Sequence, residues 1–347
     1  MPSPTDDVDA VVDTILANTV EAVTEEELRE IARDPKGKRA YVGYEPSGVL
    51  HLGHMLTATK LMQLQEIGFE TVILLADVHA FLNDKGTFDE IRAIADRMRD
   101  QFIAFGLDPK RTEFVLGSEF QLSEEFMLET LELTLNTTVN RAKRSMSEIA
   151  GSGPENVSQT VYPLMQALDI KALDIDLAIG GMEQRKVHML AREVLPRIDA
   201  EPPTCLHTPL ISDLDTGLGK MSSSEGTTIS MEDTRADIER KINAAFCPPT
   251  RDPDPEVYLS GGGVNPADVE LNNPVLQLFE FHVFPRFDSV TIKRPSKHGG
   301  NVTFESAAAL EAAVESGAVH TDDLKTNLAT YLDILIEPGR EQLSATR

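Results

Sequence analysis

Short apolar runs alternate with longer segments of helical period along most of the chain. Runs of apolar or β-branched residues predict strands at 40–44, 71–76, 114–116, 175–179 and 206–211. Between these runs, apolar residues recur every three or four positions, which predicts helices. Strands that alternate with helices are typical of a parallel sheet wound by helices, in which ligands bind beyond the carboxyl ends of the strands. Residues that directly follow each run are therefore the first candidates for a functional site.

The pattern changes toward both ends of the chain. The first 35 residues have helical periodicity, and Thr24 with Glu27 predicts a capping box. The segments 202–231 and 247–274 are rich in Gly and Pro, which predicts loops, and further helical periods with a short strand pair follow them. The predicted fold class is α/β, with an N-terminal helical extension at 1–35, a Rossmann-like catalytic domain with a parallel sheet at 36–232, and a smaller, mainly helical C-terminal domain at 233–347.

The chain is strongly acidic. The 57 acidic residues outnumber the 32 basic ones and give a net charge of −25, and such self-repulsion destabilises a compact chain unless salt screens it. We interpret the acidic residues as a halophilic surface, with an ordinary acidic enzyme as the alternative. The longest aliphatic stretch, 72–76, is far shorter than the ~20 residues of a membrane span, and the first ten residues lack an export signal. Cys205 and Cys247 are the only cysteines, so a reducing cytoplasmic location is expected.

Two histidines stand just after the first predicted strand of the sheet, in the sequence His51-Leu-Gly-His54. A helix is predicted to start there, and both imidazoles then lie on one face of its first turn. A helix start offers free N–H groups and the positive end of the dipole, which suits a polyphosphate, and Gly53 leaves room for a flat base. Capping or surface histidines are the alternative interpretation. A metal pair has less support, because no third ligand stands nearby.

The second motif is Gly-Lys220-Met-Ser-Ser223-Ser-Glu225-Gly, after the last predicted strand of the sheet. One cation followed by hydroxyl groups can fold over a phosphate, with Lys220 supplying charge and Ser223 a hydroxyl or backbone contact. Taken alone, a solvated loop explains this segment equally well. Together and in this order, the two motifs are the twin signature of the class I aminoacyl-tRNA synthetases.

The resemblance extends over nearly all of the chain. The chain resembles the archaeal-type tyrosyl-tRNA synthetases in the runs YVGYEPSGVLHLGH, LLADVHAFLNDKG, GSEFQL, RSMSEIA, YPLMQALDI, GGMEQRKVHMLAREVLP, GKMSSSEG and IKRPSKHGG. The N-terminal extension and the segment 252–264 are less similar. The resemblance implies a tyrosine–tRNA ligase, which activates L-tyrosine with ATP to tyrosyl-adenylate and then transfers tyrosine to the 3′-terminal ribose of tRNA(Tyr). Mg²⁺ is expected to arrive with ATP, and no metal site of the protein's own is expected.

The resemblance also implies an amino-acid pocket. Spacing alone places Tyr162, Gln166 and Asp169 on one helical face, which is equally typical of the wet face of an amphipathic helix. A phenol both donates and accepts a hydrogen bond, so Asp169 as acceptor and Tyr41 as donor match a tyrosine side chain. The remaining residues that the resemblance places at the amino acid are Tyr162, Gln166, Gln184, His79 and Leu74.

For ATP, the resemblance implies six residues. They are Gly53, His51, His54, Glu183, Lys220 and Ser223, of which His51, His54, Lys220 and Ser223 are the catalytic candidates. No enzyme nucleophile is needed, because alignment and stabilisation of the pyrophosphate accelerate both displacements. Glu225 stands where many relatives have lysine, so its side chain is expected to point away from phosphate.

For tRNA, the resemblance implies contacts in both domains. Arg144, Arg185 and Lys186 are expected at the acceptor end, and basic clusters on so acidic a protein are informative. The anticodon is expected to meet Pro295, His298, His320 and Asp323, and His298 replaces an aromatic residue that is usual among relatives. A homodimer is implied, with no membrane contact. The tryptophanyl enzyme and a catalytically silent RNA-binding module are the rival interpretations.

Overall fold

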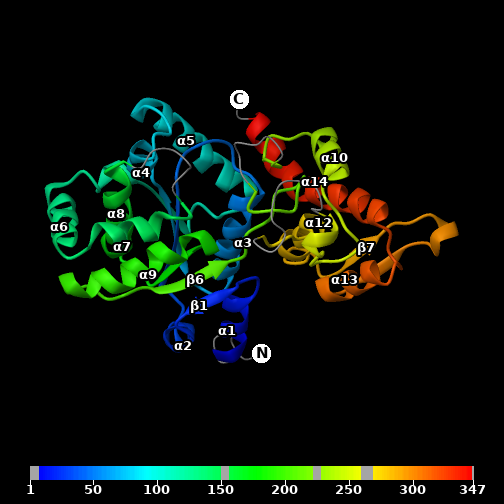
Figure 1. The fold of residues 1–347 in the computed structure, drawn as a ribbon, viewed down its shortest axis with the longest axis horizontal. Helices are drawn as coiled ribbons and strands as arrows, with labels where there is room; N and C mark the ends of the chain where they lie inside the picture. Colours follow the sequence, from blue (N-terminus) through cyan, green and yellow to red (C-terminus); the bar gives the residue numbers. More distant parts are fainter. Residues whose placement is uncertain (1–7, 150–155, 222–227, 259–268, 346–347) are drawn as a thin grey trace. The chain divides into compact units, whose positions relative to one another are not determined.

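The computed structural model of the chain describes residues 8–149, 156–221, 228–258 and 269–345 (Figure 1). The chain divides into two units, which we describe separately. The first unit comprises Met1–Val49 and Thr57–Pro209, and the second comprises Leu50–Leu56 and Leu210–Arg347. The functional boundaries expected from the sequence, 36–232 and 233–347, stay a prediction.

The first unit is built on a six-stranded sheet, with the strand order β1-β6-β5-β2-β3-β4 among the described residues. The strands β2 to β6 are parallel to their neighbours, and β1 is antiparallel to β6. The bounds are Glu21–Val23 for β1, Arg39–Tyr44 for β2, Glu70–Leu75 for β3, Thr112–Leu116 for β4, Leu177–Gly181 for β5 and Thr204–Thr208 for β6. The predicted α/β class with a mostly parallel sheet is confirmed.

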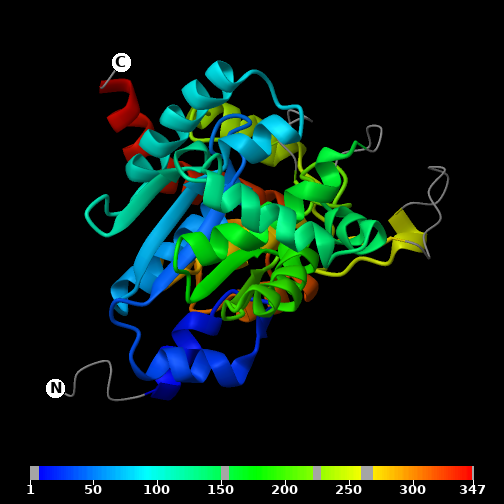
Figure 2. The ribbon, with the colours of Figure 1, turned by 90° about the vertical axis from the view of Figure 1, so that its left-hand side faces the viewer.

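Helices connect the strands of this unit (Figures 1 and 2). Their bounds are Val8–Leu16 for α1, Glu25–Arg33 for α2, Leu52–Glu66 for α3, Asp77–Leu82 for α4, Phe88–Phe105 for α5, Glu124–Leu135 for α6, Val139–Met146 for α7, Ser158–Ala172 for α8 and Arg185–Val194 for α9. The capping box that Thr24 and Glu27 predict is present at the start of α2. The helices α7, α8 and α9 pack against one another, and this cluster carries most of the polar residues discussed below.

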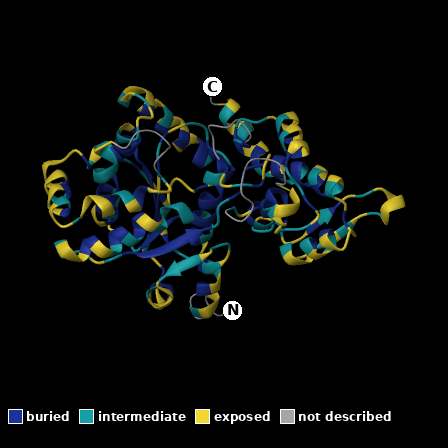
Figure 3. Cartoon of the chain, in the orientation of Figure 1, coloured by how far each residue is buried: buried dark blue, intermediate teal, exposed yellow. Residues whose placement is uncertain are grey.

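The core of the first unit lies around the inner strands, which are dark blue in Figure 3. In β3, every residue after Glu70 is buried, and all five residues of β6 are buried. Continuous burial of this kind arises because helices cover a parallel sheet, so its strands do not alternate between buried and exposed positions. Tyr41 and Leu74 belong to the same buried cluster as Leu164 and Leu168 of α8. None of the helices in the described ranges is both long and apolar enough to span a membrane.

The N-terminal extension differs from the helical prediction, because β1 extends the sheet. Glu21 pairs with His207 and Val23 with Cys205 in the antiparallel register of β1 and β6. A three-residue strand shows no alternation, so its sequence gave no periodic signal. The predicted end of the last strand also moves, from residue 211 to Thr208, because the next residue is Pro209, which has no N–H for the ladder.

A buried lysine fixes the extension to the rest of the first unit. Lys60 of α3 is only 2% exposed, and its ammonium donates to the carbonyl oxygens of Thr14 (3.3 Å), Ile15 (3.2 Å) and Ala17. These carbonyls belong to the C-terminal end of α1 and the residue after it, where the helix itself supplies no donors. Burial lowers the pKa of Lys60 to about 7, and the protonated form also interacts favourably with the helix dipole.

We expect Lys60→Met to lower the free energy of unfolding by about 3 kcal/mol, because the apolar stem is kept while buried carbonyl oxygens lose their donor. Denaturant titration in concentrated KCl measures this loss. Lys36→Met, at an exposed position, is the matched control and should change stability little. A loss for Lys60→Met no larger than that of the control would show that the ammonium contacts do not stabilise the extension.

The second unit contains the start of α3 and the C-terminal part of the chain. Its other helices are Arg235–Ala244 for α10, Pro255–Tyr258 for α11, Pro274–Leu278 for α12, Ala307–Glu315 for α13 and Thr321–Ala345 for α14. The chain continues from α12 into a π-helical turn, Phe279–Val283. The strands β7, Val290–Ile292, and β8, Val302–Phe304, form an antiparallel pair. The predicted strand pair and the predicted C-terminal helices are thus present.

Candidate active site

Asp169 lies at the centre of a buried polar cluster in the first unit. Its side chain, on α8, is fully buried, and its Oδ1 accepts a hydrogen bond from Nε2 of Gln121 at 2.6 Å. The same amide nitrogen lies 3.2 Å from Nδ1 of His79, so one NH₂ group can donate to both neighbours. Gly117 allows this arrangement, because a Cβ there would collide with Oε1 of Gln121. Gln121 thereby fixes the orientation of both side chains.

His79 and Asp169 do not form an ion pair, although Nε2 of His79 lies 3.6 Å from Oδ2 of Asp169. Burial lowers the pKa of His79 to about 4, so the imidazole is neutral at pH 7. Burial also raises the pKa of Asp169 well above its usual range, and the hydrogen bond from Gln121 offsets part of this effect. Nδ1 of His79 faces a donor, so the ring proton belongs on Nε2.

The second carboxyl oxygen of Asp169 is unsatisfied. Oδ2 is buried and has no hydrogen-bond partner within the described residues. A buried polar group without a partner costs about 1–3 kcal/mol, so natural proteins rarely leave one without a purpose. The oxygen lies in a cluster with the rings of Tyr162 and His79, whose centroids are 4.4 Å apart at an edge-to-face angle of 82°. A ligand that brings a hydrogen-bond donor, such as a hydroxyl group, would satisfy this oxygen.

Tyr41 and two glutamines form a second part of the same region. Tyr41 of β2 is 1% exposed, and burial raises the pKa of its phenol well above the usual value, so it keeps its proton. The side-chain amide of Gln166 of α8 offsets part of this rise in pKa, and Nε2 of Gln166 donates to Oε1 of Gln184 at 3.0 Å. Tyr41, Gln166 and Gln184 therefore lie in one region of the first unit, and their role at an amino acid stays a prediction. Leu74 is buried in the same cluster as Tyr41.

The hydroxyl of Tyr162 binds the carboxylate of Glu45. It donates to Oε1 of Glu45 at 2.6 Å, and the side-chain amide of Asn83 donates to both oxygens of Glu45 at 3.1 and 3.2 Å. Glu45 follows β2 immediately, at the carboxyl end where ligands of parallel sheets bind. A carboxylate in this place can hold an ammonium group.

Sequence reasoning missed three residues of this cluster, Gln121, Glu45 and Asn83. Glu45 and Gln121 both lie soon after strands of the sheet, β2 and β4, so the rule that ligands bind beyond strand ends could have selected them. Asn83 gave no signal, because it acts only by holding Glu45.

The two histidines of the first motif stand at the start of α3, in the second unit. Their ring centroids are 3.8 Å apart, and each ring accepts a backbone hydrogen bond: Nδ1 of His54 from the N–H of His51 at 3.3 Å, and Nδ1 of His51 from the N–H of Gly53 at 3.1 Å. Burial lowers the pKa of His51 to about 4 and that of His54 well below its usual value. Both rings are therefore neutral, with Nε2–H as the donor that each can offer.

A hydrogen-bonded ladder joins the first motif to the chain that follows the second motif. The N–H of Leu52 donates to the carbonyl of Ile229 at 3.0 Å, and the N–H of Met231 donates to that of Leu50 at 2.9 Å. His51 and Ser230 form the antiparallel bridge between these bonds. The chain at residues 229–231, which follows the second motif in the sequence, thus lies beside the start of α3.

The described part of the second motif ends at Met221. Lys220 is exposed, and the N–H of Met221 donates to the carbonyl of Ile211 at 2.7 Å. Ser223 and Glu225 lie outside the described residues. In the first unit, Oε2 of Glu183 is buried and lacks a hydrogen-bond partner in the described ranges. No group of three or more His, Cys, Asp or Glu side chains in the described part of the chain is placed to hold a metal ion.

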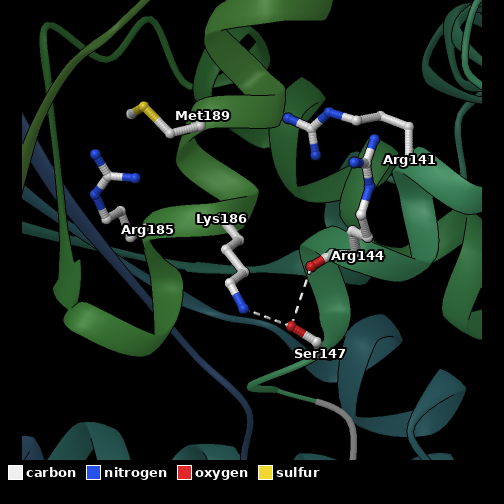
Figure 4. A pocket seen from close by; sticks show the side chains of 6 residues that line it. All are labelled: Arg141, Arg144, Ser147, Arg185, Lys186 and Met189. Atoms are coloured by element: carbon white, nitrogen blue, oxygen red, sulfur yellow. Dashed lines mark hydrogen bonds between the residues drawn. The ribbon is translucent and has the colours of Figure 1, made fainter.

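A cationic pocket lies between α7 and α9 of the first unit (Figure 4). Its volume is about 340 Å³. The lining residues are Arg141, Arg144, Ser147, Arg185, Lys186 and Met189. The structure therefore gathers the three residues expected at the tRNA acceptor end, Arg144, Arg185 and Lys186. Arg141 adds a fourth cation to the pocket, and its Nε lies 2.8 Å from Oε2 of Glu193.

The residues expected at the anticodon come from two adjacent segments of the second unit. Pro295, His298 and His320 are exposed, and Asp323 is half-buried. The amide nitrogen of Asn327 donates to the carbonyls of Lys293 at 3.1 Å and Asp323 at 2.7 Å. Because one side chain bonds both segments, the residues after β7 lie beside the start of α14.

Comparisons with known proteins agree with these motifs. A family profile described as tRNA synthetases class I (W and Y) matches residues 35–336. A tyrosine–tRNA ligase of Halorubrum lacusprofundi is 63% identical over 95% of this chain and 98% of its own, and one of Halobacterium salinarum is 59% identical over 96% and 98%. The crystal structure of a tyrosyl-tRNA synthetase complexed with L-tyrosine, from Archaeoglobus fulgidus, is 48% identical, with a TM-score of 0.87 over 97% of this chain and 100% of that one.

These relatives decide between the interpretations that the sequence left open. The acidic surface fits a halophilic protein, because two of the most similar relatives come from haloarchaea. The tyrosyl rather than the tryptophanyl enzyme is the match at high identity. The chain therefore belongs to the archaeal-type tyrosyl-tRNA synthetases of class I, the enzymes that ligate tyrosine to tRNA.

Proposed function

We propose that the cluster around Asp169 binds the side chain of L-tyrosine. The observation that carries this proposal is the buried, unsatisfied Oδ2 of Asp169. The substrate phenol would donate to this oxygen and accept from the hydroxyl of Tyr41, which stays protonated. Leu74 and the ring of His79 would pack against the substrate ring. Phenylalanine leaves the same polar groups unpaired, so the site rejects it.

The other end of the amino acid would meet the second polar group. Glu45 offers a carboxylate to the ammonium, and its hydrogen bonds from Tyr162 and Asn83 fix its position. The amides of Gln166 and Gln184 can bond the ammonium and the carboxylate. Because both ends of tyrosine are held, the substrate carboxylate is already aligned for attack on the α-phosphorus of ATP.

We assign ATP to the two signature motifs. The neutral rings of His51 and His54 and the start of α3 would donate to phosphate oxygens, and Lys220 and Ser223 would bind the pyrophosphate. Gly53 leaves room for the base, and the unsatisfied oxygen of Glu183 can accept from ribose hydroxyls. Mg²⁺ would arrive as part of the MgATP substrate.

The reaction then proceeds in two displacements. The tyrosine carboxylate oxygen attacks the α-phosphorus of ATP, a new oxygen–phosphorus bond forms, and pyrophosphate leaves to give tyrosyl-adenylate. A ribose hydroxyl at the 3′ end of tRNA next attacks the adenylate carbonyl, and AMP leaves. Negative charge grows on the departing pyrophosphate in the first step, so cationic and N–H groups lower that barrier most.

For tRNA, we propose two contact regions. The cations Arg144, Arg185 and Lys186 would bind the acceptor end, because a cluster of positive charge on a protein with net charge −25 selects phosphate. Pro295, His298, His320 and Asp323 would receive the anticodon. An exposed imidazole such as that of His298 can stack on a base, although less strongly than a larger ring.

We also propose a homodimer through α6, and a cytoplasmic location for it. One face of α6 exposes Leu128, Leu131 and Leu135, which are 59, 57 and 86% exposed, and Figure 3 shows this helix largely yellow. Exposed apolar residues in one row are typical of a protein–protein contact.

A cytoplasmic location is supported by the free thiols Cys205 and Cys247.

If α6 forms the dimer contact, Leu131→Asp should yield a monomer in analytical ultracentrifugation at micromolar protein, because each subunit would bury an unpaired charge. Ile334→Asp is the matched control, since Ile334 is an exposed apolar residue on α14 (48% exposed), and it should stay dimeric. If the Leu131→Asp variant stays dimeric, the dimer contact lies elsewhere. If the wild type is a monomer, there is no dimer contact.

Exchange of labelled pyrophosphate into ATP, measured with each of the twenty amino acids and over a range of KCl concentrations, tests the proposed site as a whole. We expect exchange with tyrosine alone and a rate that rises with KCl, because salt screens the repulsion among acidic residues. Exchange with tryptophan, or with no amino acid, would contradict the proposal.

A further inference from the structure

Arg185, one of the cations of the pocket in Figure 4, is held by an acidic residue of the N-terminal strand. Nε and Nη2 of Arg185 donate to the two carboxylate oxygens of Glu21 at 2.6 and 2.8 Å. This is the bidentate geometry that fixes a guanidinium most firmly. The hydrogen bond from Arg185 is the main reason that the pKa of Glu21 is lowered, so the carboxylate is ionised at neutral pH.

Two buried histidines lie beside Glu21. His207 of β6 is the register partner of Glu21, and its Nδ1 lies 3.3 Å from Oε2 of Glu21. Nε2 of His207 lies 3.1 Å from Nδ1 of His188. Both imidazoles are at most 1% exposed, and burial lowers the pKa of each. Nδ1 of His207 makes no hydrogen bond within the described residues, so His207 packs beside the Glu21 carboxylate without bonding it.

His188 lies on α9, three residues after Arg185, and Glu21 of β1 is the residue that bonds the Arg185 guanidinium. The remaining donors of Arg185, both protons of Nη1 and one of Nη2, are not used by Glu21 and can bond a phosphate or a base edge.

The other cations of the pocket are bound differently. Lys186 contacts Glu148 at 2.6 Å and Ser147 at 2.8 Å, near the end of α7, and Arg144 has no carboxylate partner among the described residues. Arg185 instead depends on a residue 164 positions earlier in the chain. An arginine that is free to rotate loses rotamer entropy when a ligand immobilises it, so fixing it before binding favours the complex.

We propose that Glu21 is a positioning residue for tRNA: it holds Arg185 in the conformation that binds the acceptor end, which makes the N-terminal strand β1 part of that site. This inference rests on the proposed role of Arg185. It predicts that removal of a negative charge weakens the binding of a polyanion, the opposite of what charge alone would do.

Steady-state aminoacylation of tRNA(Tyr) tests this proposal with Glu21→Ala. We expect KM for tRNA to rise by up to about tenfold, the upper end of the cost of immobilising one flexible side chain on binding, while kcat changes little. Pyrophosphate exchange should keep its wild-type rate, because that reaction needs no tRNA. Glu26→Ala is the matched control, since it removes an exposed acid from the same extension, and it should leave KM unchanged.

A double-mutant cycle with Arg185→Ala then separates this proposal from the proposed function. If Glu21 acts through Arg185, the double variant should have the same KM for tRNA as Arg185→Ala alone. Additive effects, an unchanged or lower KM for Glu21→Ala, or a matching loss of exchange would each overturn the positioning role. If Arg185→Ala itself leaves KM unchanged, the acceptor site is misassigned, and both proposals for Arg185 fall.

Discussion

Asp169→Ala should reduce kcat/KM for tyrosine in pyrophosphate exchange by at least about 10³-fold, because the substrate phenol would then lie in a buried site without its acceptor. The change also leaves Nε2 of Gln121 without the partner that it bonds at 2.6 Å. The substrate hydroxyl thus loses its acceptor, and Gln121 keeps only its contact with His79. Exchange with saturating ATP and varied tyrosine measures the effect.

The control for this variant is Asp100→Ala, at an exposed position of α5, and it should exchange at the wild-type rate. Asp169→Asn keeps the shape of the side chain and one acceptor oxygen, so its loss should lie between those of the wild type and Asp169→Ala. Far-UV circular dichroism should be the same for all three variants. A wild-type rate for Asp169→Ala would mean that another group binds the phenol.

Lys220→Ala should lower kcat for exchange by about 10²–10³-fold, the usual cost of removing one group that stabilises transition-state charge. The affinity for tyrosine should stay within about twofold of the wild type, because only an interaction made in the transition state is lost. Tyrosine binding followed by calorimetry and exchange followed by isotope transfer give the two numbers independently.

Lys297→Ala is the matched control for Lys220→Ala, since both lysines are exposed residues of the second unit. Lys297 lies beside the proposed anticodon contacts, which exchange does not use, so its rate should be unchanged. If Lys220→Ala weakened tyrosine binding as much as it slowed exchange, the residue would act on the ground state. The assignment of Lys220 to the pyrophosphate would then be wrong.

Much of the fold could be predicted because a buried parallel sheet leaves an obvious pattern. The strands β2, β3 and β5 are continuous apolar runs, and the turns around them are rich in Gly and Asp. The strand β1 could not be predicted, because Glu-Ala-Val has no alternation and forms a strand only against the edge of β6. The contact between Lys60 and the end of α1 could not be predicted from the sequence either, because a lysine in a helix normally lies on its solvent-exposed face.

The site could be predicted where several residues form a local motif. His51 and His54 stand three residues apart, and their meeting with the segment after Lys220 follows from the twin signature. Gln121 and Glu45 were missed because a single Gln or Glu has no spacing that indicates its chemistry. The contact between Glu21 and Arg185 joins residues 164 positions apart, and only the register of β1 against β6 brings them together.

The central claim is that the free oxygen of Asp169 recognises the phenol of tyrosine. The ratio of kcat/KM for tyrosine to that for phenylalanine, measured by pyrophosphate exchange in the wild type and in Asp169→Ala, tests it most directly. We expect a ratio of at least about 10⁴ in the wild type, as for a site built to bond a hydroxyl, and a fall of at least about 100-fold in the variant. An equal ratio in the two proteins would contradict the account.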